Sequence, residues 1–295
     1  MDFQFNSPVQ KIEDAVFTDQ KLELYLKRDD LIHPLISGNK WRKLRYVLQE
    51  ARNQHKKHLV TFGGAFSNHL LATAAAGATF GFQTTGFVRG ENVQNDTLFM
   101  CRLLGMKLIF TDRESYQHKP GLFSEHFQND SEAFFIDEGG ASAAAALGCS
   151  ELVDEFSEKY DHLFCACGTG TTAAGIINGL TNNNLSTQFH AVSVLKNAGW
   201  MQQEIEKYLL KEASFLNHTQ YDFGGYAKTT PQLLQFIQQF IAATGILIDP
   251  VYTGKMLFAI YNLANKKYFL PGSRILAIHT GGVFGLLGMK GKFSL

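Results

Sequence analysis

The chain has 295 residues, which is enough for one large or two moderate α/β domains with a sizeable core. Its 27 Lys and Arg residues balance its 27 Asp and Glu residues, so no net positive charge points to nucleic acid or an anionic membrane as a partner. No apolar run approaches the ~18 residues of a membrane-spanning helix. No signal peptide is evident at the start, and we expect a cytoplasmic protein.

The four cysteines indicate neither a metal site nor a disulfide framework. Cys165 and Cys167 lie in one apolar run without a matching Cys/His pair near them, and Cys101 and Cys149 stand apart. We expect four buried free thiols in a reducing compartment and no bound metal.

Strand-like and helix-like stretches alternate along the chain. This alternation favours an α/β fold with doubly wound, mostly parallel sheets that are covered by helices on both faces. In chain order the expected elements are strand 58–62, helix 67–78, strand 84–88, helix 97–104, strand 107–111, strand 162–166, helix 172–180, strand 190–195, helices 233–244 and 256–265, and strand 274–279.

Glycine-marked turns divide this pattern into two parts. The best candidate boundaries lie near Asn39 and at Gly139-Gly140. We expect a larger domain of residues 1–43 plus 141–295 and a smaller α/β domain of residues 44–140, each of ordinary domain size. Ligands on such sheets lie at the carboxyl ends of the strands, where glycine turns lead into helices.

The run Ser37-Gly38-Asn39-Lys40 predicts the start of a helix that Ser37 or Asn39 can cap. Lys40 then lies in the first turn, where the helix dipole favours the neutral amine that nucleophilic or imine chemistry requires. A lone lysine at this position is more often a solvated side chain. The expected apolar face of the helix consists of Trp41, Leu44, Val47, Leu48 and Ala51.

The next candidate turn, Gly63-Gly64, precedes Ser67 between a predicted strand and a predicted helix. Backbone amides at a helix N-terminus bind anions, and the hydroxyl of Ser67 is a further donor. A substrate carboxylate fits such a site, and Asn68 is placed to donate to a phenolate oxygen. The alternative is that Ser67 only caps the helix.

A third turn, residues 168–172, again follows a strand and precedes a helix. Its glycines allow a phosphate to approach the backbone, and its threonine hydroxyls are further donors. The run from Gly168 to Ala173 formally matches the G-x-G-x-x-A fingerprint of dinucleotide sites, which requires an acidic residue about 20 positions later. The next strand ends instead at Lys196 with no acid. A small phosphorylated cofactor therefore fits better than a dinucleotide.

Residues 249–255 and 279–282 are further turns after apolar runs. Tyr252 is a candidate general acid/base or an aromatic wall for a flat ring, and Thr253 and Thr280 are candidate neutral partners for a heterocyclic nitrogen. Each feature alone is typical of ordinary turn chemistry.

Together these segments resemble the D-cysteine desulfhydrase and 1-aminocyclopropane-1-carboxylate (ACC) deaminase family of pyridoxal-phosphate enzymes, which is tryptophan synthase β-like, or fold type II. The likeness covers residues 27–282, nearly the whole chain. Its most specific motifs are Lys-Arg-Asp-Asp at 27–30, Gly-Asn-Lys-x-Arg-Lys-Leu at 38–44 and Asp-Pro-Val-Tyr-Thr-Gly-Lys at 249–255.

The resemblance implies that pyridoxal 5'-phosphate is bound in a cleft between two domains, with Lys40 as its Schiff-base partner, and that the protein is a homodimer. It also implies that Ser67, Asn68 and His69 meet the substrate carboxylate. The implied catalytic residues are Lys40, Ser67, Tyr226 and Tyr252, and the implied cofactor-binding residues are Lys40, Lys43, Asn68, Gly168, Thr169, Gly170, Thr171, Thr172, Thr253 and Thr280.

The residue after Tyr252 bears on the reaction. ACC deaminases typically place a glutamate there, where a carboxylate keeps the pyridine nitrogen protonated; here it is Thr253. A neutral threonine makes a weaker electron sink, which suffices for α,β-elimination. We therefore expect a lyase that converts D-cysteine to pyruvate, ammonia and sulfide, with ACC deamination to 2-oxobutanoate and ammonia as the alternative. A nucleotide-dependent oxidoreductase and a catalytically silent binding protein are the other hypotheses, and the visible spectrum of the pure protein separates the first of these from a pyridoxal-phosphate enzyme.

Overall fold

The computed structural model describes residues 5–293. Its strands are β1 (Val9–Ile12), β2 (Glu23–Lys27), β3 (His58–Gly64), β4 (Gln83–Arg89), β5 (Lys107–Thr111), β6 (Ala133–Ile136), β7 (His162–Cys167), β8 (Gln188–Ser193), β9 (Leu216–His218) and β10 (Arg274–Ile278). They form a six-stranded sheet with the order β1-β2-β10-β7-β8-β9 and a four-stranded sheet with the order β5-β4-β3-β6. Every pairing is parallel except that of β1 with β2, which agrees with the predicted fold class.

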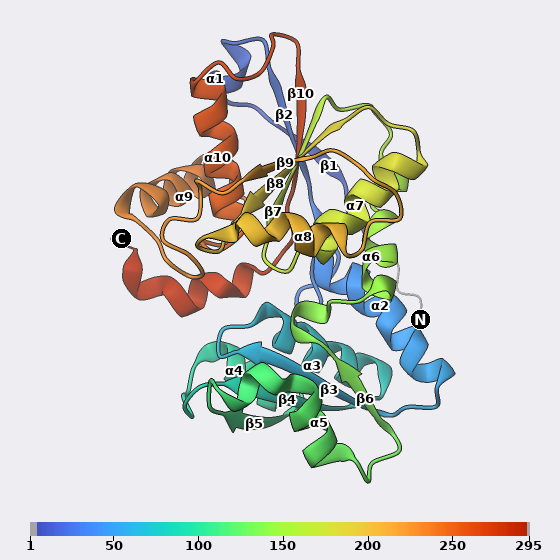
Figure 1. Ribbon diagram of the computed structural model, residues 1–295. Helices are drawn as coiled ribbons and strands as arrows, with labels where there is room; N and C mark the ends of the chain where they lie inside the picture. The colour runs from blue at the N-terminus through green and yellow to red at the C-terminus, as the bar shows by residue number, and fades with distance from the viewer. Residues whose placement is uncertain (1–4, 294–295) are drawn as a thin grey trace.

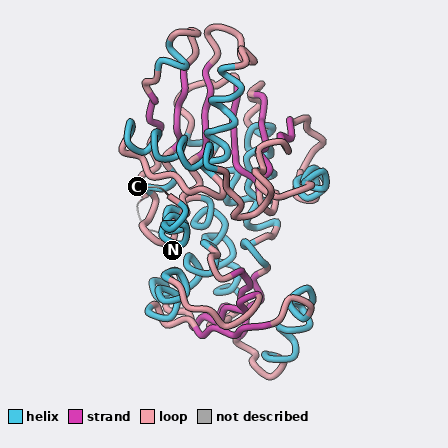
Figure 2. The backbone as a smooth tube through the Cα atoms, turned by 90° about the vertical axis from the view of Figure 1, so that its left-hand side faces the viewer, coloured by secondary structure: helices cyan, strands magenta, loops and turns pink. Residues whose placement is uncertain are grey.

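Helices cover both sheets and connect them (Figure 1). They are α1 (Ala15–Thr18), α2 (Asn39–Asn53), α3 (Asn68–Phe80), α4 (Asp96–Leu103), α5 (Lys119–Phe127), α6 (Ala143–Ser150), α7 (Thr171–Asn182), α8 (Met201–Glu206), α9 (Pro231–Thr244) and α10 (Thr253–Asn265). The 3₁₀ segments are η1 (Asp29–Leu31), η2 (Ser115–His118), η3 (Glu138–Gly140), η4 (Val153–Glu155), η5 (Ala198–Trp200) and η6 (Val283–Lys292). Figure 2 shows the larger sheet above and the smaller sheet below, with helices between them.

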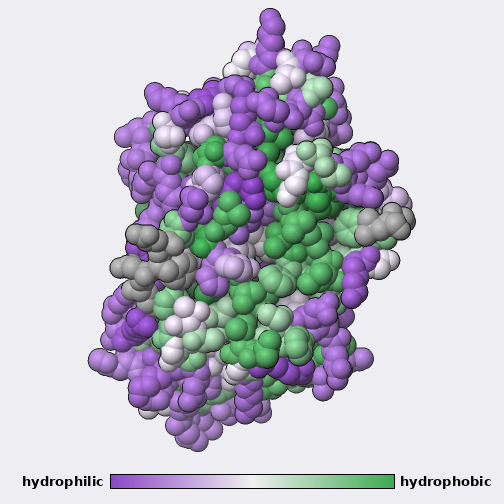
Figure 3. All heavy atoms as spheres, turned by 180° about the vertical axis from the view of Figure 1, so that it is seen from behind, coloured by the Kyte–Doolittle hydropathy of each residue, from purple (hydrophilic) through white to green (hydrophobic). Residues whose placement is uncertain are grey.

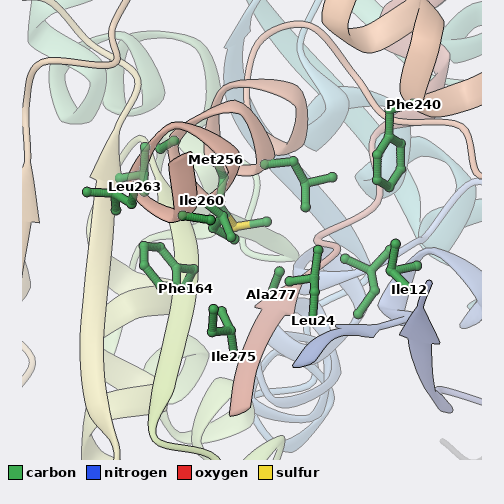
Figure 4. Packing of buried hydrophobic residues seen from close by; sticks show 14 of the residues in the cluster. Ile12, Leu24, Phe164, Phe240, Met256, Ile260, Leu263, Ile275 and Ala277 are labelled. Carbon is green, nitrogen blue, oxygen red and sulfur yellow. The ribbon is translucent and has the colours of Figure 1, made fainter. Parts of the chain in front are cut away.

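Strand β7 shows how the larger sheet is buried on both faces. Side chains alternate along a strand, so Phe164 and Ala166 pack toward α9 and α10, whereas Leu163, Cys165 and Cys167 pack toward α7. Figure 4 shows Phe164 beneath Met256, Ile260 and Leu263 of α10. Burial on both faces explains why the parallel strands read as continuous apolar runs in the sequence.

The predicted elements are present with small shifts at their ends: the helix expected at 172–180 spans 171–182, for example, and the strand expected at 107–111 keeps those bounds. All four cysteines are buried and free, as predicted. The division into domains stays a prediction, and its expected boundary between residues 43 and 44 falls inside α2. Within residues 5–293, no helix is both long and apolar enough to cross a membrane.

A row of three histidines crosses the edge of the larger sheet. His162 Nδ1 lies 3.0 Å from His190 Nε2, and His190 Nδ1 lies 2.9 Å from His218 Nε2. The His190 ring stacks on Phe164 with its centroid 4.1 Å away. Burial lowers the pKa of His190 to about 3, and the neighbouring His218 and His162 act in the same direction. The fold therefore requires this imidazole to be neutral.

We expect this row to make the protein acid-sensitive. Between pH 6.5 and about 3 the unfolded chain binds a proton at His190 that the folded chain excludes, so the free energy of unfolding falls as the pH falls. At pH 5 His190 alone accounts for a loss of about 2 kcal/mol. Urea unfolding at a series of pH values measures this slope. His190→Gln should be less stable at pH 7 but less pH-dependent, and the exposed His118→Gln serves as the control; equal slopes in all three proteins would contradict the argument.

Candidate active site

Helix α2 begins at a point of very close backbone contact. Its N-cap is Gly38, at φ 63°, and no side chain caps the helix. A Cβ atom on Gly38 would lie 1.8 Å from the carbonyl oxygen of Thr280, so only glycine fits there. The predicted cap by Ser37 or Asn39 is therefore wrong: Ser37 Oγ accepts from the Gly282 amide at 3.3 Å, and Asn39 Nδ2 donates to Thr172 Oγ1 at 2.9 Å.

Buried ion pairs fix α2 to the larger sheet. The guanidinium of Arg42 binds Asp29 through two hydrogen bonds of 2.6 and 2.7 Å and binds Glu155 through two of 2.8 and 2.9 Å. Lys27 Nζ lies 2.6 Å from the same Glu155 carboxylate. Burial opposes the charge of Arg42, but Asp29 and Glu155 raise its pKa overall. Lys27 and Asp29, which belong to the run at 27–30 that carries the resemblance, therefore hold the helix in place.

Lys40 and Lys43 lie one turn apart on α2 and face a cavity of about 510 Å³. Lys43 Nζ donates to the Gly139 carbonyl at 3.0 Å. The side-chain amine of Lys40 has no hydrogen-bond or ion-pair partner among residues 5–293. Burial and the neighbouring Lys43 lower the pKa of Lys40 to about 7, so a large fraction of its amine is neutral and able to act as a nucleophile near neutral pH.

The turn after β3 brings Ser67, Asn68 and His69 to the opposite wall of the cavity. Ser67 is the N-cap of α3, and its Oγ accepts from the Leu70 amide at 3.3 Å. Both readings of Ser67 are therefore compatible with the geometry, because the hydroxyl hydrogen stays available to an anion. Asn68, the first residue of α3, lies against Gly282, where a Cβ atom would come within 2.4 Å of Asn68 Nδ2.

The tautomer of His69 follows from its hydrogen bonds. Thr61 Oγ1 donates to the Ile136 carbonyl at 3.0 Å and lies 2.8 Å from His69 Nε2. Since a hydroxyl has one hydrogen, Nε2 must carry the other and donate to Thr61. Burial, together with Lys40 and Lys43, lowers the pKa of His69 well below its usual value. His69 Nδ1 then carries no hydrogen and has no partner among residues 5–293, so the groups at this turn that can donate to an anion are the backbone amides and the Ser67 hydroxyl.

The turn after β7 forms the floor of the cavity, with Gly168, Thr169, Gly170 and Thr172 on its surface. A Cβ atom on Gly168 would project to 3.1 Å from the Tyr252 ring and narrow the space between them. The amides at the start of α7 have no acceptor within the helix. Thr171 does not line the cavity, and its buried hydroxyl oxygen has no partner among residues 5–293. This donor set suits a phosphate group.

Tyr226 and Tyr252 close the cavity on the side of the larger sheet, with their ring centroids 6.2 Å apart and edge to face. Burial, with Tyr226 and Asp249 nearby, raises the pKa of Tyr252 well above its usual value, so its hydroxyl is protonated and is a donor. Thr280 also lines the cavity, but Thr253 does not. Thr253 Oγ1 is buried without a partner among residues 5–293, while its amide donates to Asp249 Oδ1 at 2.9 Å.

These residues fit pyridoxal phosphate. The cavity is lined by Lys40, whose amine has a lowered pKa and no partner among residues 5–293, and by the neighbouring Lys43. A glycine-rich helix N-terminus with threonine hydroxyls and two tyrosine rings complete the lining. The fold and the site together define an enzyme that holds a small phosphorylated cofactor on a lysine.

Comparison with known proteins gives this class a name. Residues 2–281 match the model of the family described as pyridoxal-phosphate dependent enzymes, and the chain belongs to this family. It is 30% identical over 293 residues to a bifunctional D-cysteine desulfhydrase/ACC deaminase of Arabidopsis thaliana described as mitochondrial, with 90% of this chain and 73% of the relative covered.

Solved structures support the same fold. A crystal structure of an ACC deaminase homologue superposes with a TM-score of 0.89 at 27% identity, covering 98% of this chain and 93% of the other. A hydrogen sulfide-producing enzyme from Fusobacterium nucleatum gives a TM-score of 0.68 at 16% identity, covering 94% of this chain and 95% of the other, which speaks for the fold alone. The chain thus has the fold type II architecture of pyridoxal-phosphate enzymes.

Several cavity residues were not foreseen from the sequence. Arg89 is the last residue of β4, and Glu138 follows β6 by two residues, so both stand at the carboxyl edge of the smaller sheet, where ligands bind. Their positions at or just after strand ends could therefore have marked both residues as candidates in the sequence. The remaining unforeseen polar or aromatic residues of the lining, which no motif marks, include Lys119, Trp200, Glu204, Lys207 and Tyr208.

We expect Lys40 to be the covalent attachment point of pyridoxal phosphate. The pure protein should be yellow, and borohydride reduction followed by peptide mass spectrometry should place the cofactor on Lys40. Among the cavity-lining lysines of residues 5–293, Lys40 is the one whose amine has no hydrogen-bond or ion-pair partner. Lys40→Ala should lose turnover entirely but keep weak cofactor binding through the turn at 168–172. Cofactor found on Lys43 or Lys255 instead would overturn the assignment.

Proposed function

We propose that the chain catalyses α,β-elimination on a small amino acid, with D-cysteine as the favoured substrate. One water molecule is consumed when the released enamine hydrolyses, and the products are pyruvate, ammonia and sulfide. The observation that carries the proposal is the neutral polar group, Thr280, on the cavity wall, with Thr253 rather than a carboxylate beside Tyr252. D-Serine and β-chloro-D-alanine are further candidate substrates, because each carries a leaving group at the same carbon. The bifunctional relative from Arabidopsis, named for both activities, supports both this reaction and its alternative, ACC deamination.

Pyridoxal phosphate, held by Lys40, would supply an electron sink for negative charge at the α-carbon of an amino acid. In the proposed reaction the Lys40 amine takes the α-proton, for which a pKa of about 7 is well matched. The Ser67 hydroxyl and the first amides of α3 hold the substrate carboxylate. Asn68, which lines the same cavity, would donate a hydrogen bond to the ring oxygen of the bound cofactor.

Tyr252 and Tyr226 serve the leaving group in this scheme. Both hydroxyls stay protonated at neutral pH, since burial raises the pKa of each tyrosine. A protonated phenol donates a hydrogen bond to the departing sulfur and shields the site from water. We assign the neutral partner of the pyridine nitrogen to Thr280, because Thr280 lines the cavity and Thr253 does not.

We expect the wild-type enzyme to release sulfide and pyruvate from D-cysteine, and to act much more slowly on L-cysteine and ACC. The neutral threonines stabilise less carbanionic charge than ring opening of ACC demands. Parallel assays of the three substrates for sulfide, pyruvate and 2-oxobutanoate decide the question. Efficient formation of 2-oxobutanoate from ACC without sulfide from D-cysteine would show that the interpretation of Thr253 is wrong.

We also propose that the protein is a homodimer, and an exposed apolar patch supports this. Phe99 and Leu103 of α4 are 62% and 67% exposed, and Leu287 of η6 and Phe66 are 46% and 48% exposed. Phe66 lies against Gly288 of η6, and η6 contacts α4. Figure 3 shows apolar residues across the middle of this face. Monomers rarely expose such a contiguous patch, and C₂ pairing is the commonest closed arrangement.

Light scattering should therefore give twice the 32.9 kDa chain mass. Replacing Phe99 and Leu103 together by Glu should give a monomer, because carboxylates on both sides of a two-fold interface repel each other. Leu270→Glu, at a side chain that is 78% exposed outside the patch, is the matched control and should stay dimeric. A monomer mass for the wild type at working concentrations would refute the proposal. The cytoplasmic location likewise stays a prediction.

A further inference from the structure

The loop between β9 and α9 carries Tyr226 and has unfavourable backbone geometry. Phe223 and Ala227 adopt φ values of 52° and 55°, and the two glycines at 224–225 adopt 94° and 115°. Such values cost free energy for residues with side chains. Contacts with the rest of the protein therefore help to hold the loop, and with it Tyr226, in place over the cavity.

Lys255 in α10 contacts this loop from below. Its side chain is fully buried, and its Nζ donates to the carbonyl of Asp222 at 2.7 Å, to that of Gly225 at 2.8 Å and to that of Val194 at 3.4 Å. An ammonium group has three hydrogens, so three carbonyls match its capacity. Two of the three acceptors belong to the loop, and the third extends the end of β8.

No carboxylate lies within ion-pair distance of this ammonium in the part of the chain that the structure describes. Burial lowers the pKa of Lys255 to about 8, Asp222 and Asp249 act in the opposite direction, and Lys292 acts with burial. The desolvated charge is therefore compensated mainly by carbonyl dipoles, so the loop and the amine hold each other in place. Lys292 Nζ also donates to the loop, to the Ala227 carbonyl at 3.1 Å, but from an exposed position.

We propose that Lys255 is a positioning residue that holds Tyr226 over the substrate cavity. Tyr226 directly follows Gly225, whose carbonyl Lys255 binds, and its ring packs edge to face on Tyr252. The inference rests on the proposed function only for the catalytic role of Tyr226. The anchoring itself depends on hydrogen bonds in the protein alone.

The anchoring is tested by hydrogen exchange of Lys255→Met, measured by mass spectrometry on the cofactor-loaded protein. Methionine fills the same apolar channel but donates nothing, so peptides that cover residues 219–230 should exchange at least about tenfold faster. Peptides of α7 should not change. Lys266→Met, at the exposed end of the same helix, is the matched control. Unchanged exchange in the loop would overturn the proposal.

If Lys255→Met does not fold, Lys255→Gln decides instead. Its amide has two donors on a shorter chain, so exchange in the loop should rise by a smaller factor while the fold is kept. No rise in the loop with this variant would count equally against the anchor.

A double-mutant cycle of Lys255→Met with Tyr226→Phe tests whether Lys255 affects catalysis through Tyr226. Each single variant should lower kcat/KM for D-cysteine by about tenfold or more, with the cofactor absorbance unchanged, and the double variant should be no worse than Tyr226→Phe alone. Multiplied losses would show that Lys255 does not act through Tyr226. A wild type without activity on D-cysteine would refute the proposed function, yet the exchange experiment would still decide the anchoring.

Discussion

The buried guanidinium of Arg42 fixes the helix on which the whole site depends. Helix α2 belongs to both halves of the molecule: its apolar face packs with Leu59 and the α3 alanines of the smaller half, whereas its N-terminal turn is bound to the larger sheet through Asp29 and Glu155. Lys40 lies two residues before Arg42. Loss of either partner would leave a buried charge uncompensated, at a cost of about 3–5 kcal/mol, so the network permits few alternative positions for this lysine.

With α2 held in this position, the cavity forms where three strand-to-helix turns meet. The turns after β3 and β7 and the turn after β10 lie at the carboxyl ends of parallel strands, where helix N-termini and glycines leave backbone amides free. Their mutual contact is close enough that Gly282 lies directly against the side chain of Asn68. The position of the cavity thus follows from the topology. The carboxyl ends of strands from both sheets face the same cavity, and α2 lines it through Lys40 and Lys43.

Local patterns made much of this predictable. Apolar runs followed by glycine gave the central strands and the turns at 63–69 and 168–172, because in a parallel sheet both features arise from the same strand end. Shorter or more polar elements gave no comparable signal, as with the three-residue edge strand β9 and the alanine-rich α6. The cap of α2 could not be predicted either, since Gly38 is required by a contact with Thr280, 242 positions away in the sequence.

The side chains that sequence reasoning missed share a physical cause. Arg42 and Lys255 read as ordinary helical positive charges, and nothing in their neighbours along the chain shows that both are buried. Their partners are the carboxylates of Asp29 and Glu155 in one case and carbonyls of a distant loop in the other. A buried charge whose hydrogen-bond partners are distant in the sequence can be recognised only in the folded structure.

A comparison of the acceptors available to each lysine identifies the reactive one without reference to any relative. Lys27, Lys43 and Lys255 are all buried, and each ammonium has oxygen acceptors: Glu155 for the first, the Gly139 carbonyl for the second and three carbonyls for the third. Acceptors stabilise the charged form and tie the side chain to one place. Lys40, on the cavity wall beside Lys43, has no such acceptor among residues 5–293, and burial lowers its pKa to about 7. It is the lysine that can lose its proton and move, and those are the two properties that covalent attachment of a carbonyl cofactor requires.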